Sequence, residues 1–122
     1  MNTFNKFVGQ SFHTSQAVAK VTGSVEFADD MQSKRALVGK ILRSPHPHAR
    51  IVNIDSSRAE RLPGVVALIT GNDFNGRYGP ALMDQPVLAR DVVRYAGEGV
   101  VAVAAEDVET ATEALDLVKI EY

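Results

Sequence analysis

The pattern of apolar and polar positions predicts a chain of short strands. They are expected over residues 36–44, 49–55, 65–71 and 100–105, with further short strands around a turn near residues 89–91. The strands over 36–44 and 100–105 carry apolar side chains on both faces, which is typical of strands covered from both sides. The strand over 65–71 is rich in β-branched residues and is expected to be buried.

One long helix is predicted over about residues 107–117. Val108, Ala111, Leu115 and Val118 recur at helical spacing and so share one face. Apolar and polar residues then alternate strictly over 118–122, which predicts a final strand. Strand, helix and strand in this order are consistent with a parallel crossover unit, right-handed if both strands share a sheet.

A second, short helix is predicted over about residues 57–62. Ser57 and Glu60 have the spacing of a capping box, and Pro63-Gly64 is expected to end the helix after a turn or two. Short mixed strands with one main and one short helix place the chain in the α+β class. Residues 1–20 are polar and weakly patterned, so we expect an N-terminal arm followed by a single domain over 21–122.

Composition narrows the possible chemistry. The chain has 122 residues, of which 45% are hydrophobic and 23% charged, as in an ordinary globular domain. The absence of cysteine excludes disulfides, thiolate metal sites, cysteine-ligated iron–sulfur clusters and a cysteine nucleophile. The apolar runs are far shorter than the roughly 20 residues of a membrane-spanning helix, and the N-terminus lacks a signal-peptide pattern. We therefore expect a cytoplasmic protein with no membrane partner.

The formal net charge of −2 is too small to indicate a nucleic-acid partner. The charges are unevenly distributed, because residues 95–122 carry seven acidic residues against Lys119 alone. A solvated acidic helix face accounts for this stretch, and we prefer that interpretation to an acidic patch that docks a partner.

Two of the three histidines, His46 and His48, lie in the segment SPHPHAR and invite a metal-site hypothesis. On an extended backbone such a pair points to one side and can chelate one metal ion. Zinc needs further ligands, however, and neither His13 in the polar arm nor Asp55 stands at a recognised spacing. Because prolines flank both histidines, we favour a stiff connection between two strands.

The other candidate residues are weaker. Glu98 lies between Gly97 and Gly99, where a bend or a close backbone approach is a better explanation than chemistry. Asp29 and Asp30 are adjacent, so their side chains point apart on an extended chain and favour a polar turn.

Residues 72–86 form a long loop rich in Gly, Asn and Pro, a type that is often functional or ordered by a partner. Its Arg77 and Tyr78 are candidates to contact a ligand, although covering the edge of the core is the simpler role. We assign no catalytic, cofactor-binding or metal-ligating residue to the chain.

The order of segments resembles a known family. VGQSFHTSQAVAKVTGSVEFADDM, LRSPHPHARIVNID, LPGVVALIT, YGPALMDQPVLARDVVRYAGE and VVAVAAED…ATEALDLVKIEY are similar to the start of the molybdopterin-binding large subunit of the xanthine dehydrogenases, aldehyde oxidases and aerobic carbon monoxide dehydrogenases. The resemblance covers about residues 8–122 and implies the N-terminal α/β hammerhead domain. Two departures are Gly99, where the family often has Pro, and Gln16, in a region where Asp is common.

The resemblance implies a structural role. The complete enzymes of the family hydroxylate an electron-poor carbon on a molybdenum cofactor, with 2Fe-2S clusters and usually FAD on other domains or subunits. The residues that bind the pterin and the catalytic glutamate belong to later domains, so the isolated chain is expected to be inactive. Its implied partners are the remaining domains of the large subunit and the iron–sulfur and flavin subunits or domains, and alone it is expected to self-associate through uncovered apolar surface. The alternative is a free-standing small-molecule or metal-binding module on the same fold.

Overall fold

The computed structural model describes residues 9–31, 33 and 35–122, so the first eight residues of the predicted arm lie outside the described part. The chain divides into two units, Met1–Lys34 and Arg35–Tyr122. The predicted division into an arm over 1–20 and a domain over 21–122 stays a prediction, and its boundary falls within the first unit.

Two short helices lie in the first unit. They are α1, Ala17–Val21, and the 3-10 helix η1, Ala28–Asp30. A five-residue helix has little stability of its own, and α1 buries none of its residues. The Asp30 carboxylate accepts the Phe27 backbone N–H at 2.9 Å, so this acid forms the polar turn expected for the Asp29-Asp30 pair.

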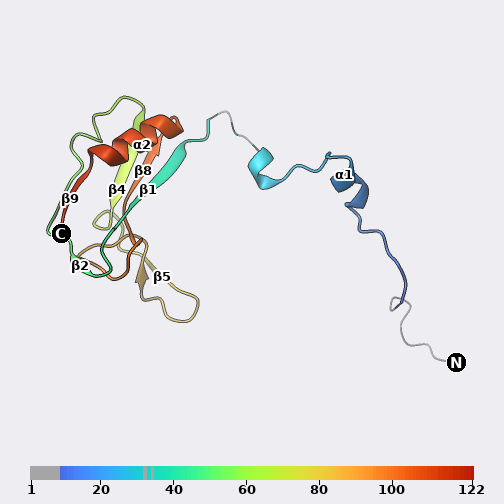
Figure 1. The fold of residues 1–122 in the computed structure, drawn as a ribbon, viewed down its shortest axis with the longest axis horizontal. Helices are drawn as coiled ribbons and strands as arrows, with labels where there is room; N and C mark the ends of the chain where they lie inside the picture. The colour runs from blue at the N-terminus through green and yellow to red at the C-terminus, as the bar shows by residue number, and fades with distance from the viewer. Residues whose placement is uncertain (1–8, 32, 34) are drawn as a thin grey trace. The chain divides into compact units, whose positions relative to one another are not determined.

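A three-stranded antiparallel sheet organises the second unit. Its strands are β1 (Val38–Arg43), β8 (Gly99–Ala105) and β4 (Val65–Thr70), in the order β1-β8-β4. The helix α2, Val108–Leu117, lies across one face of this sheet (Figure 1). The α+β class and the main helix are thus confirmed.

The remaining strands form three antiparallel pairs. They are β2 (Ala49–Arg50) with β7 (Val92–Val93), β3 (Asn53–Asp55) with β9 (Lys119–Glu121), and β5 (Arg77–Tyr78) with β6 (Gln85–Pro86). The parallel crossover suggested for β8, α2 and β9 is wrong, because β9 pairs with β3 and β8 belongs to the central sheet. The loop predicted over 72–86 holds the small β5–β6 hairpin.

Local chemistry explains where α2 begins. The Asp107 carboxylate accepts the Thr110 backbone N–H at 2.7 Å, as an N-cap does. Ala111 and Ala114 are the buried residues of α2, whereas Val108 remains 50% exposed despite its place in the predicted apolar face. The helix therefore packs through small side chains, which let it approach the sheet closely.

The short helix predicted over residues 57–62 is wrong, since this segment is a run of turns. The Ser57 hydroxyl donates to Asp55 at 2.6 Å instead of capping a helix, and the Glu60 carboxylate accepts the Ser56 hydroxyl at 2.5 Å. A single turn before Pro63 and Gly64 adds too few backbone hydrogen bonds to offset the cost of helix nucleation.

Two clusters of buried residues form the core. The first lies under α2 and joins Ala59, Val103 and Ala105 to the helix, and the second centres on Ala89, Val93, Val100 and Val101. β8 contributes to both clusters because it is the central strand. The register shifts at two points: Val100 of β8 has no partner opposite Leu42 and Arg43 of β1, and Val66 of β4 has no partner in β8.

No described helix is long and apolar enough to cross a membrane.

Candidate functional site

The two histidines of the SPHPHAR segment lie in a turn that follows β1. The backbone N–H of His46 donates to the hydroxyl of the buried Ser44 at 3.0 Å. The His46 ring packs edge-on against Tyr122, with ring centres 4.7 Å apart and an angle of 66° between the planes. His46 thus contacts the residue that follows β9, and the interpretation of this segment as a stiff connection between two strands stays a prediction. His48 is exposed.

The described residues do not assemble a metal site. They contain no group of three or more His, Asp or Glu side chains placed to hold an ion, and the chain has no cysteine. Without cysteine, the chain offers no thiolate to ligate an iron–sulfur cluster.

Glu98 is a buried acid with a structural role. Its side chain accepts the Arg94 backbone N–H at 2.5 Å and lies 3.8 Å from the Arg94 guanidinium, while its backbone carbonyl accepts the Ser44 N–H at 2.9 Å. Gly97 has φ +92°, a conformation that favours glycine, so the predicted bend is confirmed. A Cβ at Gly99 would lie 3.0 Å from the Ile41 side chain, so this glycine lets β8 begin close to β1.

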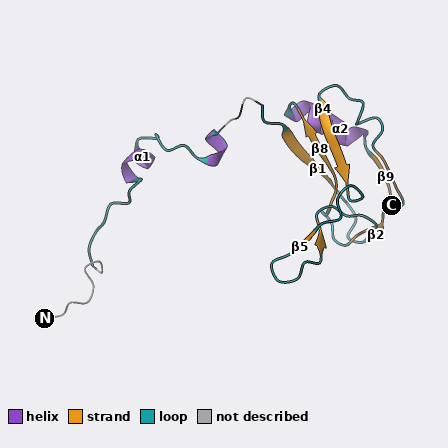
Figure 2. Ribbon diagram, turned by 180° about the vertical axis from the view of Figure 1, so that it is seen from behind, coloured by secondary structure: helices purple, strands orange, loops and turns teal. Residues whose placement is uncertain are grey.

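The face of the sheet turned away from α2 is apolar and largely open. Ile41 of β1, Ala102 of β8 and Ile69 of β4 are cross-strand neighbours, and the two isoleucines are 45% and 42% exposed. Gly39, Ala104 and Ala67 form the adjoining row. Figure 2 shows no helix of the second unit over this face. The cover on both sides predicted for β1 and β8, and the burial predicted for β4, are therefore wrong for this unit.

We call this surface the open sheet face and define it by Ile41, Ala67, Ile69, Ala102 and Ala104. Small alanines fill its centre and two isoleucines flank them, so a shallow hollow of about 150 Å³ lies over the alanines. Exposed apolar surface of this kind is typical of an interface.

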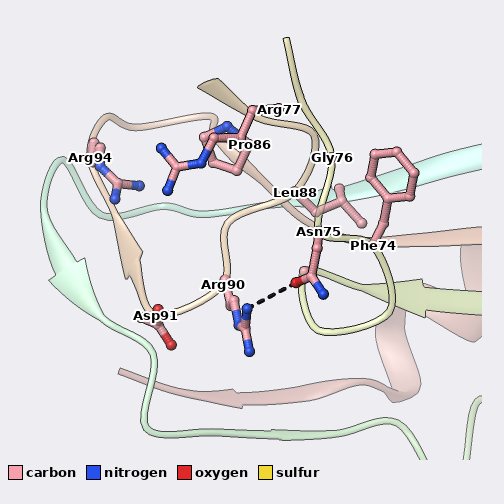
Figure 3. A pocket seen from close by; sticks show the side chains of 10 residues that line it. Phe74, Asn75, Gly76, Arg77, Pro86, Leu88, Arg90, Asp91 and Arg94 are labelled. Atoms are coloured by element: carbon pink, nitrogen blue, oxygen red, sulfur yellow. Dashed lines mark hydrogen bonds between the residues drawn. The ribbon is translucent and has the colours of Figure 1, made fainter. Parts of the chain in front are cut away.

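A second hollow lies at the other end of β4, next to the long loop. It is a cavity of about 180 Å³, and its lining includes Arg77, Arg90 and Arg94, one acid, Asp91, and the apolar side chains Phe74, Pro86 and Leu88 (Figure 3). Of these three arginines, only Arg77 is a candidate from the sequence alone. No spacing rule connects the three arginines, because separate segments of the chain bring them to one cavity.

Hydrogen bonds hold the turn that forms one wall of this cavity. The Asp73 carboxylate accepts two hydrogen bonds from Thr70, one from its backbone N–H at 2.7 Å and one from its side-chain hydroxyl at 2.8 Å. Gly71 allows the close approach of the opposite wall, because a Cβ there would lie 2.5 Å from the Ala89 carbonyl oxygen. Asn72 and Asn75 are thereby brought to the Arg90 guanidinium, to which they offer acceptors at 3.1 and 2.9 Å.

Three exposed carboxylates have lowered pKa values, each because of a local hydrogen bond to the ionised form. The Ser57 hydroxyl lowers the pKa of Asp55, and the backbone N–H of Thr70 lowers that of Asp73. The backbone N–H of Thr110 likewise lowers the pKa of Asp107. All three carboxylates fix turns or helix ends rather than a reaction centre.

Comparison with known proteins shows the family. The family described as aldehyde oxidase and xanthine dehydrogenase, a/b hammerhead domain, matches residues 22–122. A probable xanthine dehydrogenase subunit of Bacillus subtilis (strain 168) is 46% identical over 105 residues, which are 84% of this chain and 14% of that protein. The nicotinate dehydrogenase large molybdopterin subunit of Eubacterium barkeri is 38% identical over 108 residues, which are 87% of this chain and 25% of that protein.

A solved structure supports the same assignment. The Cu,Mo-CO dehydrogenase in its carbon monoxide-reduced state matches with a TM-score of 0.84 and 33% identity, over 93% of this chain and 15% of the other. This chain thus spans a quarter or less of each of these relatives. It belongs to the aldehyde oxidase and xanthine dehydrogenase family of molybdenum hydroxylases and corresponds to the α/β hammerhead domain of their large subunits.

Proposed function

We propose that the chain is a structural domain that packs against the remaining polypeptide of a molybdenum hydroxylase large subunit and supplies no reacting group itself. The open sheet face carries this proposal, since it presents Ile41 and Ile69 to whatever covers the sheet. More than half of each isoleucine is already buried, so covering the exposed remainder contributes about 1 kcal/mol per side chain. The exposed apolar side chains of α1, Val18 and Val21, add further surface for packing.

The length of the relatives supports a partner within the same subunit. The matched region is 14% of the Bacillus protein and 15% of the CO dehydrogenase chain, so most of each relative lies outside it. We propose that the complete enzyme carries the molybdenum cofactor on that remaining part, with 2Fe-2S and FAD groups on other domains or subunits. A cytoplasmic location remains part of the same proposal.

A complementation experiment tests the packing role. The chain is co-expressed with a relative's large subunit from which the matching region has been deleted, and complex formation is measured by size-exclusion chromatography with light scattering. We expect a one-to-one complex that Ile69→Lys weakens at least tenfold, because a lysine charge in an apolar interface is costly to bury.

Val108→Lys is the matched control, because Val108 is a comparably exposed aliphatic residue on α2, on the other side of the sheet. It is expected to leave the complex intact. Absence of a complex, or equal weakening by both substitutions, would contradict the proposal. Circular dichroism on each variant verifies that the fold is retained.

A further inference from the structure

We propose that the cavity lined by Arg77, Arg90 and Arg94 binds a small oxyanion of the phosphate or carboxylate class. This goes beyond a packing role, because it gives the domain a ligand site of its own on a different surface from the open sheet face. The three arginines come from β5, from the turn before β7 and from the segment after β7 (Figure 3).

The charge of the lining favours an anion. Three guanidinium groups and the single carboxylate of Asp91 give the lining a formal charge of +2, although the whole chain carries −2. Among the described residues, neither Arg77 nor Arg90 lies within ion-pair distance of a carboxylate, and Arg94 reaches Glu98 only at 3.8 Å. An oxyanion between these like charges relieves their mutual repulsion.

Arg90 is held in place without being neutralised. Its Nε donates to the Asn72 side-chain oxygen at 3.1 Å, and its Nη1 donates to the Asn75 side-chain oxygen at 2.9 Å. Both acceptors are uncharged amides, so the guanidinium keeps its full charge. Arginine has five N–H donors, and its planar fork matches the geometry of carboxylate and phosphate groups.

Neutral carbonyl groups anchor the other two arginines. Arg77 Nη1 donates to the Asp84 carbonyl at 3.2 Å, and Arg94 Nη1 donates to the Val92 carbonyl at 3.1 Å. Each contact fixes one side of a guanidinium and uses one of its five donors. These long side chains are thus partly ordered already in the free protein. Less conformational entropy is then lost when a ligand binds, which favours binding.

The size of the cavity limits the ligand. At about 180 Å³ it has room for roughly six water molecules, which suits one phosphate or carboxylate group. Phe74, Pro86 and Leu88 complete the lining beside the arginines.

Anion titration of the 122-residue chain tests this site. Inorganic phosphate and succinate are titrated separately at low ionic strength and followed by calorimetry and amide NMR shifts, with chloride at matched ionic strength as the reference. We expect saturable binding with shifts confined to the cavity. Binding of phosphate, of succinate or of both supports the site and identifies the oxyanion class, whereas saturation by neither overturns it.

Charge-matched variants separate the cavity from general electrostatic attraction. Arg77→Gln and Arg90→Gln are each expected to weaken binding at least fivefold, whereas Arg61→Gln removes an exposed charge outside the cavity and should leave the affinity unchanged. Equal loss of anion affinity in all three variants would show that net charge alone attracts the anion, which would contradict the proposed site.

A variant that keeps every charge tests the positioning of Arg90. Asn72→Ala combined with Asn75→Ala removes both acceptors from Arg90, and we expect weaker binding although the charge of the cavity is the same. Unchanged affinity in this double variant would contradict a preorganised site. Thermal unfolding of each variant verifies that the loss of binding does not come from loss of the fold. The anion site does not depend on the packing role, so failure of the complementation experiment would leave this result unaffected.

Discussion

At the scale of single residues, short side chains that bind nearby backbone groups decide where elements begin and where turns close. Asp107 caps α2, and Asp73 closes the turn after β4. Asp55, in contrast, holds Ser57, and in doing so it removes the hydroxyl on which the predicted short helix depended. Such contacts reach only two or three residues along the chain. A capping pattern in the sequence therefore does not by itself show that a helix follows it, as Ser57 and Glu60 illustrate.

The lowered pKa values predict a loss of stability in acid. The pKa of each of Asp55, Asp73 and Asp107 lies below its ordinary 3.8 in the folded chain, so the unfolded state binds protons first as the pH falls. Their stabilising contribution is complete above pH 3.8 and is lost as the pH falls through the lower folded values. Denaturant unfolding measured at several pH values should show this decline.

Two substitutions at Asp107 separate capping from titration. Asparagine also caps helices but carries no charge, so Asp107→Asn should lower the melting temperature at pH 7 by less than Asp107→Ala does, and its stability should fall less steeply in acid than that of the wild type. Asp107→Ala removes the cap and should lower the melting temperature both at pH 7 and in acid. Identical pH profiles for the wild type and Asp107→Asn would contradict the role assigned to this carboxylate.

At the scale of elements, sequence patterns predict what is local and miss what is paired over distance. α2 has both a cap and a helical repeat, and both are encoded within its own residues. The pairing of β9 with β3, and the meeting of three separate segments at the arginine cavity, depend on contacts between distant parts of the chain. The run of apolar residues in β8 correctly predicts a strand. The apolar pattern is the same on both faces of β8, so it does not reveal that α2 covers one face while the opposite face stays open.

Two glycines in or next to the central sheet give an element-scale prediction. A Cβ at Gly71 would lie 2.5 Å from the Ala89 carbonyl oxygen, so Gly71→Ala should destabilise the fold by about 1–3 kcal/mol. The matched control is Gly39→Ala in β1, where the nearest atom is 4.0 Å away. It should be neutral or stabilise the strand by about 0.5–1 kcal/mol. Equal unfolding free energies for the two variants, from urea titration, would contradict this account of the turn.

At the scale of the whole molecule, the two units differ in what they bury. Both clusters of buried residues lie within Arg35–Tyr122, whereas α1 buries none of its residues. The family match nevertheless begins at residue 22, within the first unit. The described residues of this stretch, 22–31 and 33, therefore belong to the matched family domain but are not among its buried clusters, and we expect the rest of the large subunit to support them.

A truncated chain tests this division. A fragment of residues 35–122 retains every residue of both buried clusters, so it should unfold cooperatively at about the same temperature as the full chain. Differential scanning calorimetry on the two proteins provides the comparison. A fragment that lacks a cooperative transition would show that the first unit completes the fold.

The bulge in β4 has a consequence for the isolated chain. Val66 of β4 has no partner in the pairing with β8, so this outer strand is distorted, which hinders another strand from adding at its free edge. Apolar side chains remain exposed on the open sheet face and elsewhere, among them Val108 on α2. When two copies meet without the rest of the enzyme, we therefore expect them to associate through these side chains rather than by extending the sheet beyond β4.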